Sequence, residues 1–203
     1  MPDLLAQFGT KTDQAETAQT SLTHGSVFTG IGGMDRGLER AGLVTLWQVE
    51  NAPYNLRVLN KVWPKVQKFN DVRKCGKHNL ERVDIISGGF PCQDVSSAGK
   101  GRGLGTPDNP TERSGLWYEF RRIVDELRPP WVLAENVYRL KSNGADRVLA
   151  DMEALSYTCW PIVVGAENFR APQERKRLWV LCHRKDVAFT RVRTGTEEGE
   201  KHF

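Results

Sequence analysis

Strand-like and helix-like patterns alternate along most of this 203-residue chain. Short apolar runs of strand length are separated by amphipathic stretches that have the spacing of helices. The expected strands are 26–28, 43–49, 69–72, 83–86, 131–134, 157–165 and 178–182, and the expected helices are 34–41, 53–62, 116–127 and 145–155. This order predicts the α/β class, with a doubly wound, mostly parallel sheet that carries its sites at the carboxyl ends of strands.

Composition indicates a soluble globular protein, with 27% charged and 39% hydrophobic residues. No run is long enough to cross a bilayer, and no secretory signal is visible at the N-terminus. The cysteines are scattered, which argues against a metal site or a disulfide framework and indicates a reducing compartment: Cys75, Cys92, Cys159 and Cys182. A net charge of +4 and a pI near 8.9 indicate a polyanionic partner. We expect a tail at 1–25, one domain at 26–184 and a second tail at 185–203.

One cysteine stands in a segment suited to exposing it, Val83–Ser96. Gly88 and Gly89 predict a tight turn after the apolar run, and Pro91 stiffens the chain just before Cys92. Cys92 is therefore expected as an accessible thiol at the exit of a strand, where open α/β sheets keep their sites. The alternative is a buried structural cysteine, which is the common fate of a lone Cys.

The first expected strand runs into a glycine-rich turn, Phe28-Thr-Gly-Ile-Gly-Gly33. A strand, a glycine turn and a helix in this order place backbone N–H groups beside a ligand. The glycine pattern here is G-x-G-G, which differs from the dinucleotide-binding G-x-G-x-x-G, so a phosphate-free cofactor fits. Glu50 ends the second strand about twenty residues later, where such folds hold ribose hydroxyls. Asp71 is a further candidate contact. The alternatives are an ordinary strand-to-helix turn and a solvated acid at a strand end.

Residues 96–114 are dense in glycine and proline and too long for a plain connector in a compact domain. The cations Lys100, Arg102 and Arg113 suit a lid that closes over a phosphate backbone. A flexible insertion without such a role is the alternative interpretation of this segment.

Two later strands carry polar residues at their ends. The buried strand Trp131–Ala134 ends in Glu135-Asn136-Val137, and a partly buried carboxylate there can have a raised pKa and donate a proton. Arg175 and Arg177 stand at the entrance of the last strand and are suited to hold a base or phosphate oxygen. The alternatives are a structural Glu–Asn pair and a solvated basic edge strand.

These segments together resemble the DNA cytosine-5 methyltransferase family. The resemblance covers residues 26–184 and lies in four motifs in the family's order: Phe-x-Gly-x-Gly-Gly at 28–33, Gly-Phe-Pro-Cys-Gln at 89–93, Glu-Asn-Val at 135–137 and Gln-x-Arg-x-Arg at 173–177. It implies the Rossmann-like fold of S-adenosylmethionine-dependent methyltransferases and a restriction–modification type of DNA methylation. An RNA-methylating branch of the family exists, but the residues after its nucleophile differ from Gln93, which favours DNA.

The resemblance also implies roles for individual residues. S-adenosylmethionine is the expected cofactor, with Glu50 on its ribose and Asp71 near its adenine, and Asn51 stands where the family often has a bulky apolar residue. The expected cofactor set is Phe28, Gly30, Ile31, Gly32, Gly33, Glu50, Asn51, Asp71, Val72, Gly89, Pro91 and Leu116. The expected catalytic set is Cys92, Glu135, Arg175 and Arg177, with no metal. The expected DNA contacts are Gln93, Ser96, Lys100, Arg102, Asn136, Val137 and Gln173.

The implied reaction explains these residue types. The Cys92 thiolate adds to C6 of a cytosine that has been flipped out of the duplex, which makes C5 electron-rich. Protonated Glu135 at N3 and Arg177 at O2 offset the negative charge that develops on the ring.

Family members continue into a target recognition domain and a closing segment, and residues 185–203 resemble neither. Three interpretations therefore stay open: a minimal methyltransferase, the catalytic part of a split enzyme whose second polypeptide supplies recognition, and a non-catalytic DNA-binding or regulatory relic. We expect a cytoplasmic protein, bacterial or phage-encoded, with DNA as its partner and no membrane association.

Overall fold

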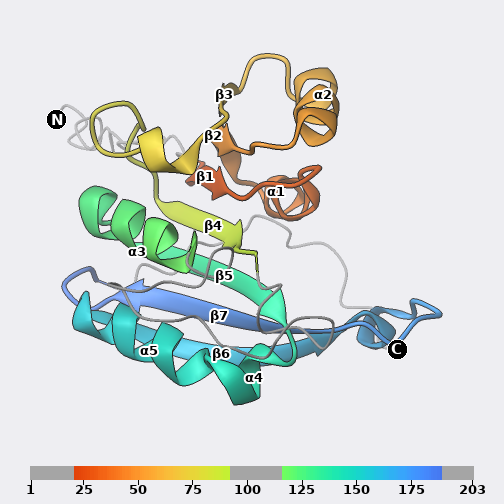
Figure 1. Ribbon diagram of the computed structural model, residues 1–203, viewed down its shortest axis with the longest axis vertical. Coiled ribbons are helices and arrows are strands. Elements are labelled where there is room, and N and C mark those ends of the chain that lie inside the picture. Colours follow the sequence, from red (N-terminus) through yellow and green to blue (C-terminus); the bar gives the residue numbers. More distant parts are fainter. Residues whose placement is uncertain (1–20, 92–115, 189–203) are drawn as a thin grey trace, which may run out of the picture.

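The sheet has the mostly parallel arrangement expected from the alternating pattern (Figure 1). The computed structural model describes residues 21–91 and 116–188, which form one seven-stranded sheet in the order β3-β2-β1-β4-β5-β7-β6. Strands β1 to β5 pair in parallel, whereas β7 runs antiparallel to both β5 and β6. The strands are β1 Thr23–Val27, β2 Val44–Val49, β3 Gln67–Phe69, β4 Ile85–Gly89, β5 Trp131–Val137, β6 Tyr157–Gly165 and β7 Lys176–Arg184.

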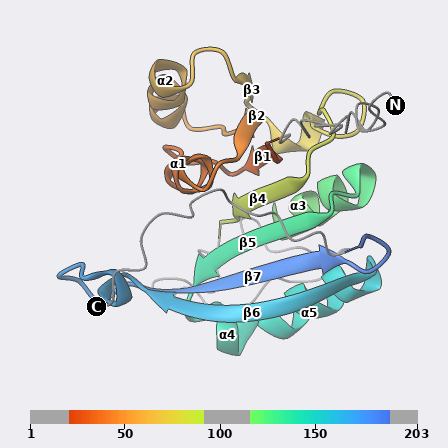
Figure 2. The same cartoon turned by 180° about the vertical axis from the view of Figure 1, so that it is seen from behind.

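The helices cover the two halves of the sheet differently. Their bounds are α1 Gly33–Arg40, α2 Pro53–Val62, α3 Leu116–Leu127, α4 Leu140–Asn143 and α5 Ala145–Ala154, with 3-10 turns η1 Val72–Lys74 and η2 Ala166–Phe169. Helices α3, α4 and α5 lie on one face of the sheet, and α1 and α2 accompany the β3–β2–β1 half (Figure 1). Seen from behind in Figure 2, β5, β7 and β6 have no helix of the described residues in front of them.

Helix bounds were predicted more accurately than strand bounds. Helices α2 and α3 have the expected bounds, whereas β1 begins at Thr23 rather than Ser26 and β7 extends beyond 178–182 in both directions. The strand expected at 69–72 lies at 67–69 instead, because the Asp71 side chain accepts a hydrogen bond from the Arg73 N–H and starts η1. Helix α4 was not expected at all. These differences lie at element ends, where short-range capping competes with the ladder.

The core lies between the sheet and helices α3 and α5. Helix α3 buries five apolar side chains there: Trp117, Phe120, Ile123, Val124 and Leu127. Strand β5 alternates between half-buried and buried residues, so Val132, Ala134 and Asn136 face the helices and Glu135 faces the other side. Gly88 pairs with Ala134, and a Cβ at Gly88 would lie 2.7 Å from the Phe120 ring, which confirms which face α3 covers.

Two buried polar clusters link the first strands. The His24 imidazole lies 2.7 Å from the Ser87 hydroxyl through Nε2 and 3.2 Å from the Thr45 hydroxyl through Nδ1. Asp35, the buried residue of α1, accepts hydrogen bonds from Ser26 Oγ and Gln48 Nε2. Burial lowers the pKa of His24 to about 4 and raises the pKa of Asp35, so burial favours the neutral form of both groups.

We expect the stability of the wild type to fall more steeply below pH 7 than that of His24→Gln. The unfolded chain binds a proton on His24 near pH 6.5, whereas the folded chain does so only near pH 4, so acid in this window favours unfolding. The extra loss in free energy of unfolding should be roughly 3 kcal/mol by pH 4, measured by urea titration at each pH. Asp35 is present in both proteins, so its contribution to the pH dependence of stability cancels in the comparison. Parallel pH profiles would contradict this account of His24.

Candidate active site

The carboxyl ends of β1 and β2 are held together by the side chain of Glu50. The Gly30 N–H donates to Oε2 and the Ala52 N–H donates to Oε1, each at 2.7 Å, and Glu50 is 8% exposed. Phe28 and Gly30 have positive φ angles of 56° and 61°, which turn the backbone after β1 so that the Gly30 N–H reaches this carboxylate. The carboxylate oxygens keep free lone pairs, so Glu50 can accept further hydrogen bonds from a diol.

A recess opens beside this carboxylate at the carboxyl edge of the sheet. Its lining combines apolar side chains with acids, an amide and one cation: Phe28, Val49, Glu50, Asn51, Asp71, Val72, Arg73, Pro91 and Leu116. Flat apolar walls with a few polar groups suit a nucleoside, which has an apolar base face and polar edges. The residues therefore fit the cofactor class expected from the sequence.

Seven of the expected cofactor residues line this recess, and the others have different positions. The Gly30 N–H acts through Glu50, and Ile31 is 57% exposed on the turn. Gly32 has φ of 84°, and a Cβ there would lie 2.4 Å from the Trp63 ring, so it is needed for packing as well as for the turn. Gly33 begins α1. Val49 and Arg73 were missed, although each adjoins an expected residue, Glu50 or Val72, and this adjacency was the available signal.

A second cluster lies where β4, β5 and β7 run side by side. Glu135 on β5 and Arg177 on β7 form an ion pair, with Nε and Oε1 3.0 Å apart. Burial raises the pKa of the Glu135 carboxyl, and the nearby cations of Arg177 and Arg175 act against that rise. The half-buried position and raised pKa of Glu135 agree with the sequence prediction, and its role as a proton donor stays a prediction.

The tight turn expected at Gly88 and Gly89 is wrong, because both residues lie within β4. Position 89 requires glycine because a larger residue would not fit beside the Glu135 carboxylate. Gly89 pairs with Glu135 across the parallel ladder, and a Cβ at Gly89 would lie 2.9 Å from Glu135 Oε2. A side chain at position 89 would therefore push the carboxylate away from its place. Gly89 thus serves the acid cluster and does not line the recess.

Asn136 ties β5 to the segment that follows β4. Its Nδ2 donates to the Phe90 carbonyl at 3.0 Å, and its Oδ1 accepts the Val137 N–H at 2.8 Å. Glu135, Asn136 and Val137 are the last three residues of β5, which extends beyond the expected 131–134. The strand continues because β7 pairs with it along its whole length. The Asn136 contact fixes the peptide that leads into Pro91.

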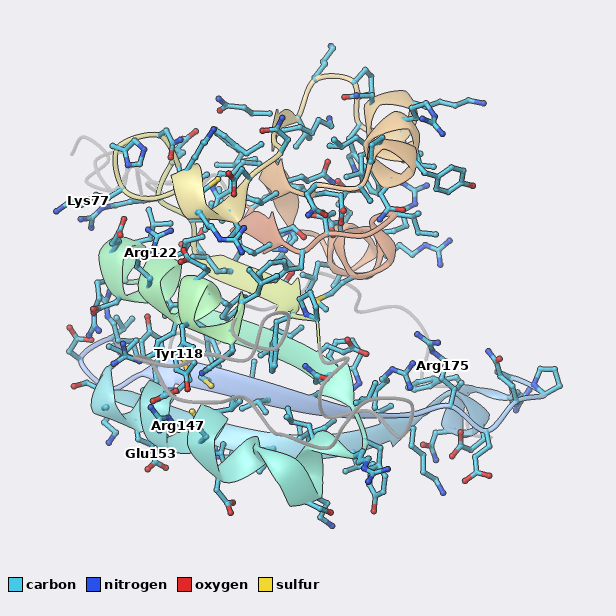
Figure 3. The ribbon with its side chains drawn as sticks, in the orientation of Figure 1. Lys77, Tyr118, Arg122, Arg147, Glu153 and Arg175 are labelled. Atoms are coloured by element: carbon cyan, nitrogen blue, oxygen red, sulfur yellow. The ribbon has the colours of Figure 1, made fainter. Side chains whose placement is uncertain are left out.

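The remaining expected residues divide between the described surface and the rest of the chain. Gln173 and Arg175 are exposed just before β7, and the Arg175 N–H donates to Glu167. Figure 3 shows Arg175 beside the end of the sheet where β5 terminates. Strand β7 lies between β5 and β6, so it is not the edge strand considered as an alternative. Outside the described residues lie Cys92, Gln93, Ser96, Lys100, Arg102 and Arg113.

The described residues contain no group of three or more His, Cys, Asp or Glu side chains placed to hold a metal ion. In the same ranges no helix combines the length and apolar character that crossing a bilayer requires.

The seven-stranded sheet and its helices have the Rossmann-like fold found in methyltransferases. A solved structure of the Entamoeba histolytica methyltransferase EhMeth superposes with a TM-score of 0.68 at 16% identity, covering 81% of this chain and 53% of that one. At that identity the likeness concerns the fold alone.

The chain belongs to the C-5 cytosine-specific DNA methylase family, whose model matches residues 22–202. It is 35% identical to the type II methyltransferase M.Eco47II of Escherichia coli, over 87% of this chain and 43% of the relative. It is 34% identical to M2.BsuMI of Bacillus subtilis, over 81% of this chain and 44% of the relative. The chain thus spans about half the length of these relatives.

We expect Asn136→Ala to lower the free energy of unfolding by about 1–3 kcal/mol, because the buried Phe90 carbonyl loses its donor. Urea denaturation of wild type and variant measures this loss. Asn70→Ala is the matched control, since Asn70 is exposed and should change stability by less than about 0.5 kcal/mol. Equal effects of the two substitutions would show that the Asn136 contact does not stabilise the segment.

Proposed function

We propose that this chain is the catalytic part of a DNA cytosine-5 methyltransferase, which transfers a methyl group from S-adenosylmethionine to C5 of a flipped-out cytosine. The position of Glu135 carries the proposal. Its carboxylate lies against Gly89, and the neighbouring Asn136 binds the Phe90 carbonyl, so the acid adjoins the Gly-Phe-Pro-Cys-Gln segment. Family membership supports DNA as the substrate class.

The nucleoside of the cofactor would occupy the recess beside Glu50. The lone pairs that Gly30 and Ala52 leave free on Glu50 suit the ribose hydroxyls, and the walls formed by Phe28 and Val72 suit the adenine. Asp71 lies at the same recess as an acceptor for an amino group. S-adenosylmethionine, when bound, supplies an electrophilic methyl group on a sulfonium.

The protein's part in the chemistry is to make C5 of cytosine nucleophilic. The Cys92 thiolate adds to C6, and the electron pair of the C5–C6 double bond becomes available for a new bond from C5 to the methyl carbon, whose bond to the sulfonium sulfur breaks with its electron pair going to sulfur. Glu135 gives its proton to N3 while Arg177 holds O2, which limits negative charge on the ring. Loss of the C5 proton to a base then expels Cys92 from C6 and restores the double bond, and the N3 proton returns to Glu135.

Target recognition would come from polypeptide outside these residues, in the same chain or a separate one. The chain spans about half the length of its relatives, which leaves room for such a part. The edge strand β6 also supports a further protein part. Its side chains Trp160, Ile162 and Val163 are 44%, 48% and 42% exposed. Exposed apolar side chains gathered on an edge strand indicate contact with further protein.

The first test is whether the chain methylates DNA through Cys92. Bisulfite mapping of DNA from cells that express this chain, alone and with a candidate recognition polypeptide, should reveal 5-methylcytosine with wild type and none with Cys92→Ala. The variant should still bind S-adenosylmethionine, because the thiol is not needed to hold the nucleoside. Methylation by both proteins would overturn the mechanism. Stable DNA binding without methylation, with or without the partner, would favour a regulatory relic.

Glu50→Gln should weaken S-adenosylmethionine binding by at least about tenfold, measured by isothermal titration calorimetry. The amide replaces one acceptor oxygen by a donor, which then faces the N–H of Gly30 or Ala52 and leaves a buried group unpaired. Glu81→Gln is the control, because Glu81 is exposed and outside the recess. If both variants bind the cofactor as the wild type does, the recess is not its site.

A further inference from the structure

A second hollow lies at the carboxyl end of β3, next to the cofactor recess. It has a volume of about 370 Å³ and is lined by α2 on one side and by β3 and the segment after it on the other: Leu56, Asn60, Lys68, Phe69, Asn70, Asp71, Lys74, Cys75 and Asn79. Asp71 lines both this hollow and the recess, so the two are neighbours. The chemistry proposed above uses no other residue of the hollow.

The segment around this hollow is strongly basic. Residues 53–82 contain eight Lys and Arg residues and two acids, Asp71 and Glu81, while the whole chain carries only +4. Seven of the cations are exposed and define what we call the β3-edge basic surface: Arg57, Lys61, Lys65, Arg73, Lys74, Lys77 and Arg82. The surface therefore has a strong local field in a chain of small net charge.

These seven cations are not neutralised within the described residues. None of them forms an ion pair there, whereas Arg122, Arg147 and Arg177 in the other half of the molecule are each paired with a carboxylate. Lys68 is different, because its ammonium donates to the backbone carbonyls of Trp63 and Val66. The exposed cations are thus free to contact an anionic partner.

The hollow presents mainly donors to such a partner. Lys74 in η1 lines the hollow, and Lys61 lies on α2, the helix that supplies Leu56 and Asn60 to the lining. The acid in the lining is Asp71, and its Oδ1 already accepts a hydrogen bond from the Arg73 N–H. Cys75 at its base is a buried thiol whose pKa burial raises to about 11, so it remains an uncharged lining group. Exposed lysines with carboxamides between them match the groups that contact phosphates in nucleic-acid complexes.

We propose that the β3-edge basic surface binds the phosphate backbone of nucleic acid, extending the DNA contact beyond the catalytic edge of the sheet. The inference rests on the proposed function in one respect, because it takes DNA as the anionic polymer that the protein binds. Figure 3 shows Lys77, one cation of this surface, at the opposite side of the molecule from Arg175.

The binding mode would be independent of sequence. The surface offers charges and amides on an open edge rather than a helix or ribbon shaped for a groove, so it would position the duplex without reading bases. Its contribution should therefore depend steeply on salt, because each neutralised phosphate releases counterions.

The test compares two double variants with the same change in net charge. Lys61→Gln/Lys74→Gln removes two cations of the β3-edge basic surface, and Arg40→Gln/Lys185→Gln removes two exposed cations elsewhere. Fluorescence anisotropy with a labelled duplex of about 30 base pairs, between about 50 and 200 mM KCl, gives affinity and salt slope. For the first variant, the slope of log K, the logarithm of the association constant, against log salt should fall in magnitude by about 2. Its affinity for the duplex at low salt should fall by at least about tenfold. The second should match the wild type.

The outcomes separate this inference from the proposed function. If both double variants lose affinity equally, only net charge matters and the β3-edge basic surface is not a binding surface. If poly-L-glutamate displaces the duplex as well as unlabelled DNA does, the surface fits an acidic protein and the assignment to nucleic acid fails. If only the first variant loses affinity while the wild type transfers no methyl groups, the surface stands and the proposed function fails.

Discussion

Glu50 is the residue at which the ends of three strands are joined, through its carboxylate and its backbone N–H. Gly30, which follows β1, donates to one oxygen, and the Glu50 N–H donates to the carbonyl of Phe69, the last residue of β3. A buried carboxylate requires such donors, since its charge would otherwise be unfavourable away from water. The positive φ of Phe28, which is costly for a residue with a side chain, is retained because it aims the backbone at this acid. The cofactor recess exists because these three strand ends are held in one place.

The two halves of the sheet carry different parts of the proposed chemistry. The β3–β2–β1 half holds the nucleoside recess, and the β4–β5–β7 half holds the acid and its arginine. The strand order reverses direction between β1 and β4, which is the position where open α/β sheets bind ligands. Pro91 and Leu116 from the second half complete the walls of the recess. A ligand there would therefore touch both halves at once.

The local periodicity of the sequence predicted most of the helices, and seven of the twelve expected cofactor residues line the recess. The period of α3 and the spacing from Gly30 to Glu50 are visible in the chain itself. Long-range pairing was not visible. The role of Gly89 depends on a carboxylate from β5, and the length of β5 depends on β7, which lies about forty residues further on. Likewise, nothing in the pattern around Asp35 indicated that an acid would be the buried residue of α1, since its partners are on β1 and β2.

The ion pair between Glu135 and Arg177 also affects how accurately the sheet assembles. In the native ladder both residues lie on the face away from α3, because successive side chains of a strand alternate between faces. A slip of β7 by one residue would send the guanidinium in among the side chains of α3 and α5, and would leave the carboxylate without its counterion. Such a misfolded sheet would bear an uncompensated charge in an apolar interior. The groups that would carry out catalysis therefore also discriminate against mispaired strands during folding.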